Sequence, residues 1–448
     1  MDARASHHGN HGLSGSGGSL GASDARSNGN EDSDLSSGRL PEAPPSTPSR
    51  RQTDAADSVR VLKPRRAAPA DAVRPTRAEV NLAALRHNLR VVARHAGTAQ
   101  VWPVLKADGY GHGAPATART LERAGAQGFC VALLEEAVEL RDAGVSSPIL
   151  VMGGYYGGAY EEISARGLIP VVYDISHLEG LSRAARSTGR PVEAHLKVDT
   201  GMARLGVRMA DLERFAASAL AHPDVKITGL MTHLACAEVG NDGATDLGGF
   251  TADQLARFEE ATARLASVGI TPRVRHAANS AAMLRGQGIL DAVRPGLAVF
   301  GVAPAGLSTE LRPTMRVRTE VVDLRTIEPG ESVGYGALFR ATRKSVIATV
   351  PVGYADGLSR HLSNRGHMLV RGRRAPIVGA VSMDMSMLDV TDVPAIGLRD
   401  EVVVLGTQEG ALGKDTISAE EVAGHAGTIP WEILTSISRR VPRFYREP

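Results

Sequence analysis

Short apolar runs alternate with stretches of helical apolar spacing between residue 76 and about residue 307. Short runs closed by turn residues predict buried strands, and apolar positions three and four apart predict amphipathic helices. The expected strands are Val101–Leu105, Phe129–Ala132, Pro148–Met152, Ile169–Tyr173, Val192–Val198, Ile227–Thr232, Arg273–Ala277 and one near Leu297–Gly301. The expected helices are Ala83–Ala96, Ala116–Ala126, Glu135–Ala143, His177–Ser187, Ala210–Ala219 and Ala252–Ser267.

Eight strand signals that alternate with helices over about 220 residues fit an α/β fold of the TIM type, an eight-stranded (β/α)8 barrel. A doubly wound open sheet is the competing interpretation. Such a sheet usually carries a Gly-rich dinucleotide loop after its first strand, and we assign no dinucleotide loop in this sequence. The pattern therefore favours the barrel, which we place at residues 75–307.

Past about residue 308 the helical stretches thin out, and turn signals separate short β-branched runs. Examples of these runs are Val346–Val352, Ile377–Val381 and Glu401–Leu405, and a helical stretch, Trp431–Ser438, follows near the end. The pattern predicts a second, mainly β domain at residues 308–448. Residues 1–74 are rich in Ser, Gly, Asp, Arg and Pro and hold no aromatic residue, so we expect a disordered low-complexity tail.

The composition excludes several classes of protein. A formal net charge of +2 is too small to indicate a nucleic-acid surface, and two cysteines in 448 residues argue against a disulfide framework or a cysteine zinc site. No apolar run approaches the roughly 18 to 20 residues of a membrane span, and the N-terminus lacks the apolar segment of a signal peptide. The cytoplasm is therefore the expected location.

The run from Val101 ends in Lys106, and three glycines follow within seven residues. A lysine at the end of a buried strand can lose part of its hydration, which lowers its pKa and lets the amine form a Schiff base. The alternative is a lysine that extends from the strand end into water. Other polar residues also fall at expected strand ends, where barrel enzymes carry their chemistry: Lys197, Asp199, His233, Asn279, Ser280 and Arg294.

Nine segments in order make the sequence similar to the alanine racemases, pyridoxal-phosphate enzymes of fold type III. The segments are Lys106–Gly113, Lys197–Gly206, Thr232–Ala235, Ala278–Ala282, Val293–Gly296, Val333–Gly336, Gly353–Gly357, Ser382–Asp384 and Arg440–Arg443. The resemblance covers nearly everything from Thr76 to the C-terminus. It implies a racemase that interconverts L-alanine and D-alanine, and so supplies D-alanine for peptidoglycan.

The resemblance also assigns roles to residues. It implies that Lys106 holds pyridoxal 5'-phosphate through a Schiff base, and that Lys106 and Tyr335 act as bases on opposite faces of the substrate. In the family this tyrosine comes from the partner subunit, which implies a homodimer with shared sites. The other residues implied at the cofactor are Tyr110, His233, Ser280, Arg294, Gly296, Leu297 and Trp431. Those implied at the substrate are Arg204, Tyr354 and Met383.

Three of these positions carry particular consequences. Arg294 would hydrogen-bond the pyridine nitrogen, and because arginine hardly gives up a proton, the nitrogen would stay largely unprotonated. By resemblance, Lys197 is a candidate for carbamylation that would hold Arg204; the alternative is an unmodified lysine paired with a carboxylate. Trp431 stands where the family typically has tyrosine, so we expect weaker cofactor binding or a reshaped access path.

Three other functions compete with that of an alanine racemase. Basic amino-acid decarboxylases of the same architecture pair the ring nitrogen with a carboxylate and carry a catalytic cysteine in the β domain. Here Arg294 fills the ring position and no cysteine follows Cys236. Non-enzymatic cofactor-binding barrels resemble only the barrel half. A serine or broad-specificity racemase of the same family stays open.

Overall fold

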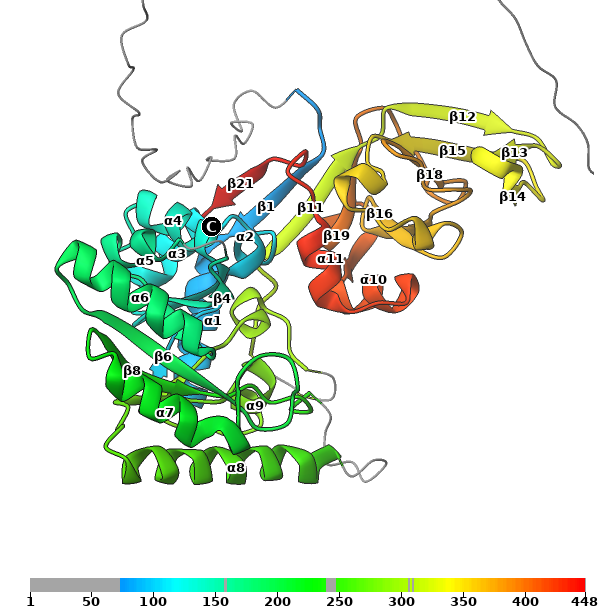
Figure 1. Cartoon of the computed structure of the whole chain (residues 1–448). Helices are drawn as coiled ribbons and strands as arrows, with labels where there is room; N and C mark the ends of the chain where they lie inside the picture. Colours follow the sequence, from blue (N-terminus) through cyan, green and yellow to red (C-terminus); the bar gives the residue numbers. More distant parts are fainter. Residues whose placement is uncertain (1–72, 157–158, 239–246, 305–306, 308–309, 448) are drawn as a thin grey trace, which may run out of the picture. The chain divides into compact units, whose positions relative to one another are not determined.

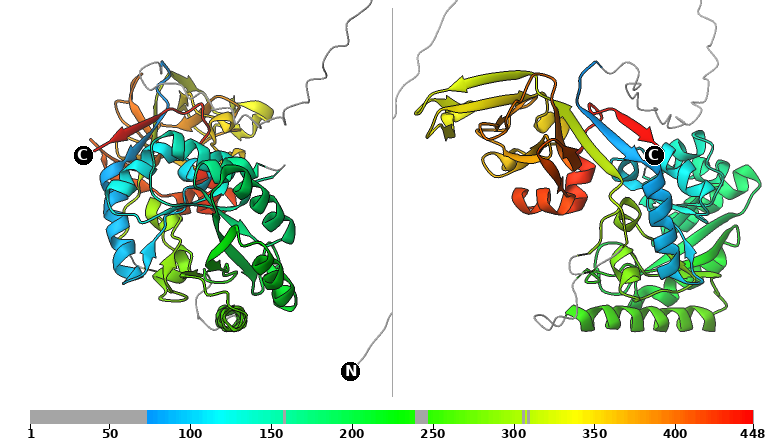
Figure 2. Two further views of the ribbon diagram at one scale, coloured as in Figure 1. Left: turned by 60° about the vertical axis from the view of Figure 1, so that its left-hand side comes forward. Right: turned by 180° about the vertical axis from the view of Figure 1, so that it is seen from behind.

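The computed structural model describes residues 73–156, 159–238, 247–304, 307 and 310–447, all within one compact unit, Ser58–Pro448. Most of the expected tail, residues 1–72, lies outside the described residues. Figures 1 and 2 show the unit as a helix-rich half in blue to green and a strand-rich half in yellow to red.

Eight short parallel strands form the barrel. One sheet has the order β3-β4-β5-β6-β8-β9 and a second pairs β10 with β2. The strands are β2 (Gln100–Val101), β3 (Phe129–Leu133), β4 (Ile149–Gly154), β5 (Ile169–Val172), β6 (Val192–Asp199), β8 (Val225–Met231), β9 (Val274–His276) and β10 (Ala292–Val293). Leu105 N–H donates to Cys130 O at 2.8 Å, and Arg294 N–H donates to Ala278 O at 3.0 Å. These bonds link the two sheets on both sides, which closes the barrel and confirms the expected fold.

The expected helices are present with shifts of a few residues at their ends. They are α1 (Leu82–Ala96), α3 (Ala114–Arg123), α4 (Leu134–Asp142), α6 (Ile175–Thr188), α7 (Leu212–Ala221) and α8 (Leu247–Ser267). Shorter helices are α2 (Lys106–Tyr110), α5 (Tyr160–Ala165) and α9 (Ser280–Leu284). Helix α8 lies at the bottom of Figure 1 and is seen end-on in the left view of Figure 2. A short strand, β7 (Val207–Arg208), pairs with the end of β6.

The eighth strand is not where the apolar pattern places it. The strand is β10, and the predicted strand Leu297–Gly301 contains a 3-10 helix instead, η3 (Leu297–Phe300). Pro295 has no N–H to donate to a strand ladder, and Gly296 O accepts the N–H of Val299 at 3.0 Å. The chain therefore turns directly after β10, and the apolar residues of η3 are buried in the core rather than in a strand.

The second half is mainly β, as expected. Its larger sheet has the order β17-β16-β19-β11-β1-β21, with β20 on β19, and a smaller sheet has the order β12-β15-β18. The strands are β1 (Arg77–Asn81), β11 (Met315–Glu320), β12 (Asp323–Ile327), β15 (Ser345–Val350), β16 (His367–Val370), β17 (Arg373–Pro376), β18 (Ser386–Asp389), β19 (Glu401–Gly410), β20 (Gly413–Ile417) and β21 (Arg443–Arg446). Helices α10 (Ala419–Ala426) and α11 (Pro430–Ser436) follow β20.

Two features of this half differ from the sequence-based expectation. Strand β1 precedes the barrel in sequence but lies between β11, antiparallel, and β21, parallel. The expected strand Ile377–Val381 is wrong, since only Ile377 forms a β-bridge. The N–H groups of Gly379 and Val381 donate to the side chains of Asn364 and Ser363, which leaves no ladder for a strand.

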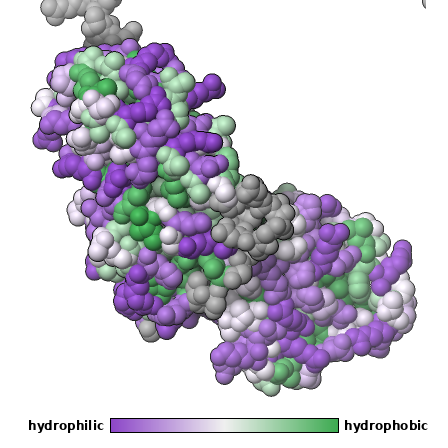
Figure 3. Space-filling model, turned by 90° about the horizontal axis from the view of Figure 1, so that it is seen from below, coloured by the Kyte–Doolittle hydropathy of each residue, from purple (hydrophilic) through white to green (hydrophobic). Residues whose placement is uncertain are grey.

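A hairpin of β13 (Ser332–Val333) and β14 (Phe339–Arg340) encloses the 3-10 helix η4 (Tyr335–Ala337). A second 3-10 helix, η5 (Tyr354–Asp356), follows β15. Hydrophobic side chains form separate patches among hydrophilic ones on the face drawn in Figure 3. Across the described residues, no helix combines the length and the apolar character that crossing a membrane requires.

Candidate active site

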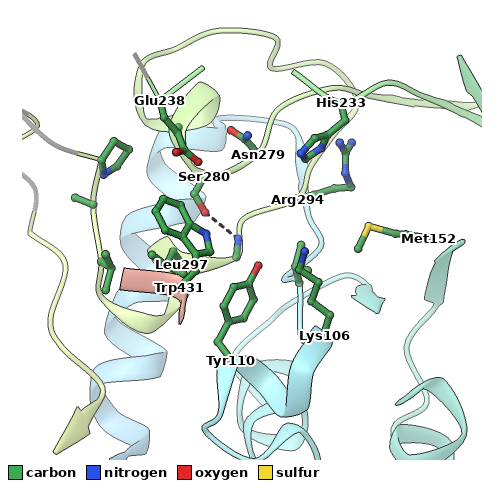
Figure 4. A pocket seen from close by; sticks show the side chains of 16 residues that line it. Lys106, Tyr110, Met152, His233, Glu238, Asn279, Ser280, Arg294, Leu297 and Trp431 are labelled. Carbon is green, nitrogen blue, oxygen red and sulfur yellow. Dashed lines mark hydrogen bonds between the residues drawn. The ribbon is translucent and has the colours of Figure 1, made fainter. Parts of the chain in front are cut away.

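One pocket at the C-terminal ends of the barrel strands brings together eight of the residues singled out from the sequence (Figure 4). These are Lys106, Tyr110, His233, Ser280, Arg294, Gly296, Leu297 and Trp431. Seven of them follow strands β2, β8, β9 and β10 of the barrel, and Trp431 belongs to helix α11 of the β half. The pocket also contains Asn279, which the sequence places at a strand end without assigning it to the cofactor, and Glu238, which the sequence reasoning missed.

Lys106 begins an unusual turn. Ala107, Asp108, Gly109 and Tyr110 all have positive φ, between 51° and 62°, a left-handed conformation that costs free energy for every residue except glycine. The turn is held by side chains: Asp108 Oδ1 accepts the N–H of Ala114 at 2.8 Å. The half-buried amine of Lys106 has a lowered pKa, chiefly because burial removes water and secondarily because Arg204 is cationic. Its neutral, nucleophilic form is therefore more accessible than that of a surface lysine.

Ser280 and Gly296 form the opposite wall of the pocket. Ser280 Oγ accepts the N–H of Gly296 at 2.8 Å, the bond drawn in Figure 4, and that of Ala298 at 3.3 Å. Asn279 caps helix α9 through Ala282 N–H at 2.9 Å, which fixes Ser280 at the start of the helix. A Cβ on Gly296 would lie 2.4 Å from Tyr110 Oη, so only glycine fits. Burial raises the pKa of Tyr110, so its hydroxyl keeps its proton as a donor into the pocket.

Arg294 is buried, with 3% of its surface exposed. Its guanidinium donates to Thr232 O at 2.8 Å, to Ala277 O at 3.1 Å and to His276 Nδ1 at 2.6 Å. No carboxylate in the described parts of the chain forms an ion pair with it. Burial lowers its pKa only to about 10, so Arg294 stays cationic near neutral pH.

A chain of buried rings supports Arg294 from within the barrel. Because Arg294 donates to His276 Nδ1, the proton of the neutral His276 ring sits on Nε2, which donates to His195 Nδ1 at 2.8 Å. Burial, with the charge of Arg294, lowers the pKa of His276 well below 6.5. Trp102 stacks on His195 with 5.7 Å between ring centroids. Sequence reasoning missed both histidines; the available signal was that each sits in an apolar strand.

His233 follows β8 and lines the same pocket. Its pKa is lowered to about 3, first by burial and then by the charges of Arg294, Arg204, Lys197 and Lys106. The imidazole is therefore neutral and has one nitrogen donor and one nitrogen acceptor at the pocket wall.

Lys197 and Arg204 lie outside the residues that line the pocket. Lys197 is buried on β6, 5% exposed, and its pKa is lowered to about 8 by burial and by Arg204 and Arg294. Within the described ranges its amine has neither a hydrogen bond nor an ion pair, so the carboxylate partner considered from the sequence is not found. Asp199 Oδ1 accepts the N–H groups of Gly201, Met202 and Ala203 at 3.0, 2.9 and 3.1 Å, which shapes the loop that carries Arg204.

Tyr335, Tyr354 and Met383 lie in the β half, and none of them lines the pocket of Lys106. Their exposed fractions are 76%, 43% and 52%. Tyr354 and Met383 belong to adjoining segments, because the N–H of Tyr354 donates to Ser382 O and that of Ala355 to Met383 O, both at 3.0 Å. Asp384 of the same segment pairs with Arg440 at 2.6 Å. A single chain thus does not unite the two predicted bases.

Comparison with known proteins matches both halves of the chain. Residues 80–304 match the family model for the alanine racemase N-terminal domain, and residues 314–445 match that for the C-terminal domain. An alanine racemase from Sorangium cellulosum is 63% identical over 385 residues, which cover 84% of this chain and 100% of the relative.

Solved structures of alanine racemases also match this chain. The alanine racemase from Streptomyces coelicolor A3(2) has a TM-score of 0.78 at 36% identity and covers 84% of this chain and 99% of that one. An alanine racemase from Bartonella henselae with covalently bound pyridoxal phosphate has a TM-score of 0.73 at 32% identity and covers 83% and 98%. With the geometry of the pocket, these matches confirm the resemblance read from the sequence: this chain belongs to the alanine racemase family of pyridoxal-phosphate-dependent isomerases.

Proposed function

We propose that this enzyme interconverts L-alanine and D-alanine with pyridoxal 5'-phosphate. The observation that carries the proposal is the pocket itself. It joins an amine of lowered pKa, a glycine and hydroxyl cradle, and a buried arginine that has no carboxylate partner among the described residues. The 63% identity to an alanine racemase over 84% of the chain supports the same reaction.

The residues present fit the cofactor. The amine of Lys106 would hold its aldehyde carbon. The hydroxyls of Ser280 and Tyr110, with the backbone at Gly296 and Leu297, would hold its phosphate, since Gly296 leaves no Cβ in the way. Arg294 would donate a hydrogen bond to the ring nitrogen, and His233 and Trp431 would lie beside the ring. When bound, the cofactor withdraws electrons from the amino acid and acidifies its Cα–H bond.

Lys106 would act as the base on one face of the substrate. Burial and the charge of Arg204 favour the neutral amine, which accepts a proton at Nζ and returns it. Racemisation needs a second proton carrier on the opposite face, and we assign that role to Tyr335. A tyrosine hydroxyl can donate a proton from its O–H group and accept one at its oxygen.

A homodimer would bring the two bases together. Tyr335 is 76% exposed on η4 and lies away from the pocket of its own chain, so a partner subunit is the simplest source of the second base. We propose that the partner subunit's Tyr335 completes each site. Arg204, Tyr354 and Met383 would contact the substrate, and Arg204 would pair with its carboxylate.

Arg294 would restrict the reaction to proton exchange. Its protons are shared among two carbonyls and His276, and its pKa of about 10 keeps it a donor, so it would not deliver a proton to the ring nitrogen. A ring nitrogen without a proton is a weaker electron sink, which disfavours transamination and decarboxylation. The histidine chain behind Arg294 would hold the guanidinium in its orientation.

We also propose that Lys197 is carbamylated. Its neutral amine would add to carbon dioxide, forming an N–C bond and releasing one proton. The product is an anion, which would supply a negative charge near Arg204 and Arg294. The support is a buried lysine, unpaired within the described part of the chain, whose pKa of about 8 supplies neutral amine at ordinary pH.

The decisive assay uses L-alanine in D2O with purified protein and pyridoxal phosphate. The expected product is D-alanine that carries α-deuterium. Unchanged alanine with the cofactor bound would refute the alanine assignment. L-serine in the same assay tests the alternative, a serine or broad-specificity racemase. Restored growth of a bacterium that requires D-alanine would test the proposed role in supplying peptidoglycan from the cytoplasm.

A further inference from the structure

The turn that carries Lys106 is held at several points by side chains from elsewhere in the fold. At its far end, His112 Nδ1–H donates to the carbonyl oxygens of Tyr110 at 2.9 Å and Gly109 at 3.1 Å, and Arg443 Nε–H donates to Gly111 O at 2.8 Å. Leu434 O would lie 2.3 Å from a Cβ on Gly111. The C-terminal residues therefore fix the turn where it leaves the pocket.

At the end next to Lys106, the side chain that holds the turn is Glu136 in the first turn of α4. Its Oε1 accepts the N–H of Ala107 at 2.6 Å, and its Oε2 accepts those of Ala132 at 2.8 Å and Leu133 at 3.1 Å. One carboxylate thus ties the residue after Lys106 to the corner between β3 and α4. Bonds from N–H groups to a carboxylate are stronger than those to a neutral acceptor.

Glu136 also acts on Lys106 through its charge. Arg204, from the loop after β6, lowers the pKa of Lys106, and Glu136 raises it. The other titratable groups at the pocket are His233, Arg294, Tyr110 and Glu238. Among the groups that shift the Lys106 pKa, Glu136 is the one whose side chain is bonded to the lysine's own turn.

We propose that Glu136 is a positioning residue for Lys106, which sets both the direction in which the lysine leaves its strained turn and the charge opposite Arg204. The inference rests on the proposed role of Lys106 as a base. Ala107 has a φ of 52°, which is unfavourable for alanine, so the backbone needs an external bond to stay there. Glu136 supplies that bond and keeps the amine aimed into the pocket.

The test compares wild type with E136Q, E136D and E135Q in the full-length protein. E135Q is the matched control, because Glu135 lies in the same helical turn, is exposed, and its side chain has no hydrogen bond or ion pair in the described portion of the chain. With the cofactor removed, competitive acetylation across a pH series, read by mass spectrometry of the Lys106 peptide, gives the titration midpoint of the amine. With the cofactor restored, kcat and KM are measured for both alanine enantiomers.

E136Q is expected to move the Lys106 midpoint to lower pH, because the negative charge is lost and Arg204 is no longer opposed. Its kcat is expected to fall about ten- to a hundredfold with KM nearly unchanged, the effect of a misaligned reacting group. E136D, which keeps the charge on a shorter side chain, is expected to return the midpoint towards wild type with a smaller loss of kcat. E135Q is expected to match wild type in both measurements.

An E136Q variant with wild-type midpoint and kcat would overturn the proposal. A fall in kcat without any shift of the midpoint would overturn it too, since Glu136 would then only support the fold. If E136Q does not fold, the positioning role is tested with E136D instead. A kcat equal to that of wild type in E136D would contradict that role. The midpoint is measured without substrate, so it tests Glu136 even if wild type fails to form D-alanine, which would refute the proposed function instead.

Discussion

Replacement of Gly296 by alanine is the sharpest test of the phosphate cradle. The added Cβ would lie 2.4 Å from Tyr110 Oη and 3.0 Å from Tyr110 Cζ. Real Cβ contacts are rarely closer than 3.4 Å, so the hydroxyl would have to move by about 1 Å. Tyr110 cannot swing away freely, because it is 6% exposed and its ring packs 5.2 Å from that of Phe300.

The cost follows from this packing. Forcing an extra methyl group into a well-packed site typically costs about 1–3 kcal/mol. If that cost falls on the bound state, the dissociation constant for pyridoxal phosphate rises between about fivefold and about 150-fold. The double variant with Tyr110→Phe should show a smaller additional loss from G296A than wild type does, because the atom that clashes is gone.

The assay is quenching of tryptophan fluorescence on addition of pyridoxal phosphate. The chain has two tryptophans, and one of them, Trp431, lines the pocket. Gly397→Ala is the matched control, because a Cβ there meets nothing within 4 Å and the backbone has no positive φ. If G296A binds the cofactor as tightly as wild type and G397A, at unchanged thermal stability, the cradle argument is wrong.

Three further predictions follow from the site. Trp431→Tyr should tighten cofactor binding by adding a hydroxyl and should change the preference between alanine and serine. If both properties stay as in wild type, Trp431 neither weakens cofactor binding nor reshapes the access path. Removing carbon dioxide and bicarbonate should lower activity reversibly if Lys197 is carbamylated, and an intact mass without the added carbon dioxide in bicarbonate buffer would contradict this. The contribution of each of the buried residues His195 and His276 to the free energy of unfolding should be flat above about pH 6.5 and should fall below it by about 1.4 kcal/mol per pH unit, because their pKa values are lowered in the folded protein and the unfolded chain takes up protons first. Denaturant titrations that show no fall between about pH 6.5 and about pH 5.5 would refute that linkage.

Much of the barrel could be predicted because its strands are short apolar runs and its helices are amphipathic. The prediction of strands failed where a nearby turn, or side chains that accept backbone N–H groups, prevented an apolar run from forming a strand. Leu297–Gly301 is as apolar as a strand, but the preceding Pro295-Gly296 starts a turn. At Ile377–Val381, the side chains of Ser363 and Asn364 take the N–H groups that a strand would use.

The site shows a similar division. Motifs located Lys106, Ser280 and Arg294 because each stands at a strand end, and the pocket brings them together. His195, His276 and Glu136 could not be identified from sequence motifs, because their importance comes from contacts between elements far apart in sequence. The position of Tyr335 outside the pocket of its own chain was implied by the family resemblance alone, since spacing along the chain does not indicate it.

Strand β1 has a consequence for how the protein is made. It leaves the ribosome before the barrel, yet its neighbours in the sheet, β11 and β21, are synthesised about 240 and 365 residues later. Closing pairs of such high contact order is slow, so β1 waits unpaired until translation is nearly complete. If the gene were cut between the two family domains, β1 would remain on the N-terminal fragment, while β11 and β21 would lie on the C-terminal fragment. The edges of β11 and β21 that pair with β1 would then be open, which favours aggregation. The two halves are therefore separable in sequence comparisons but not as independent folding units.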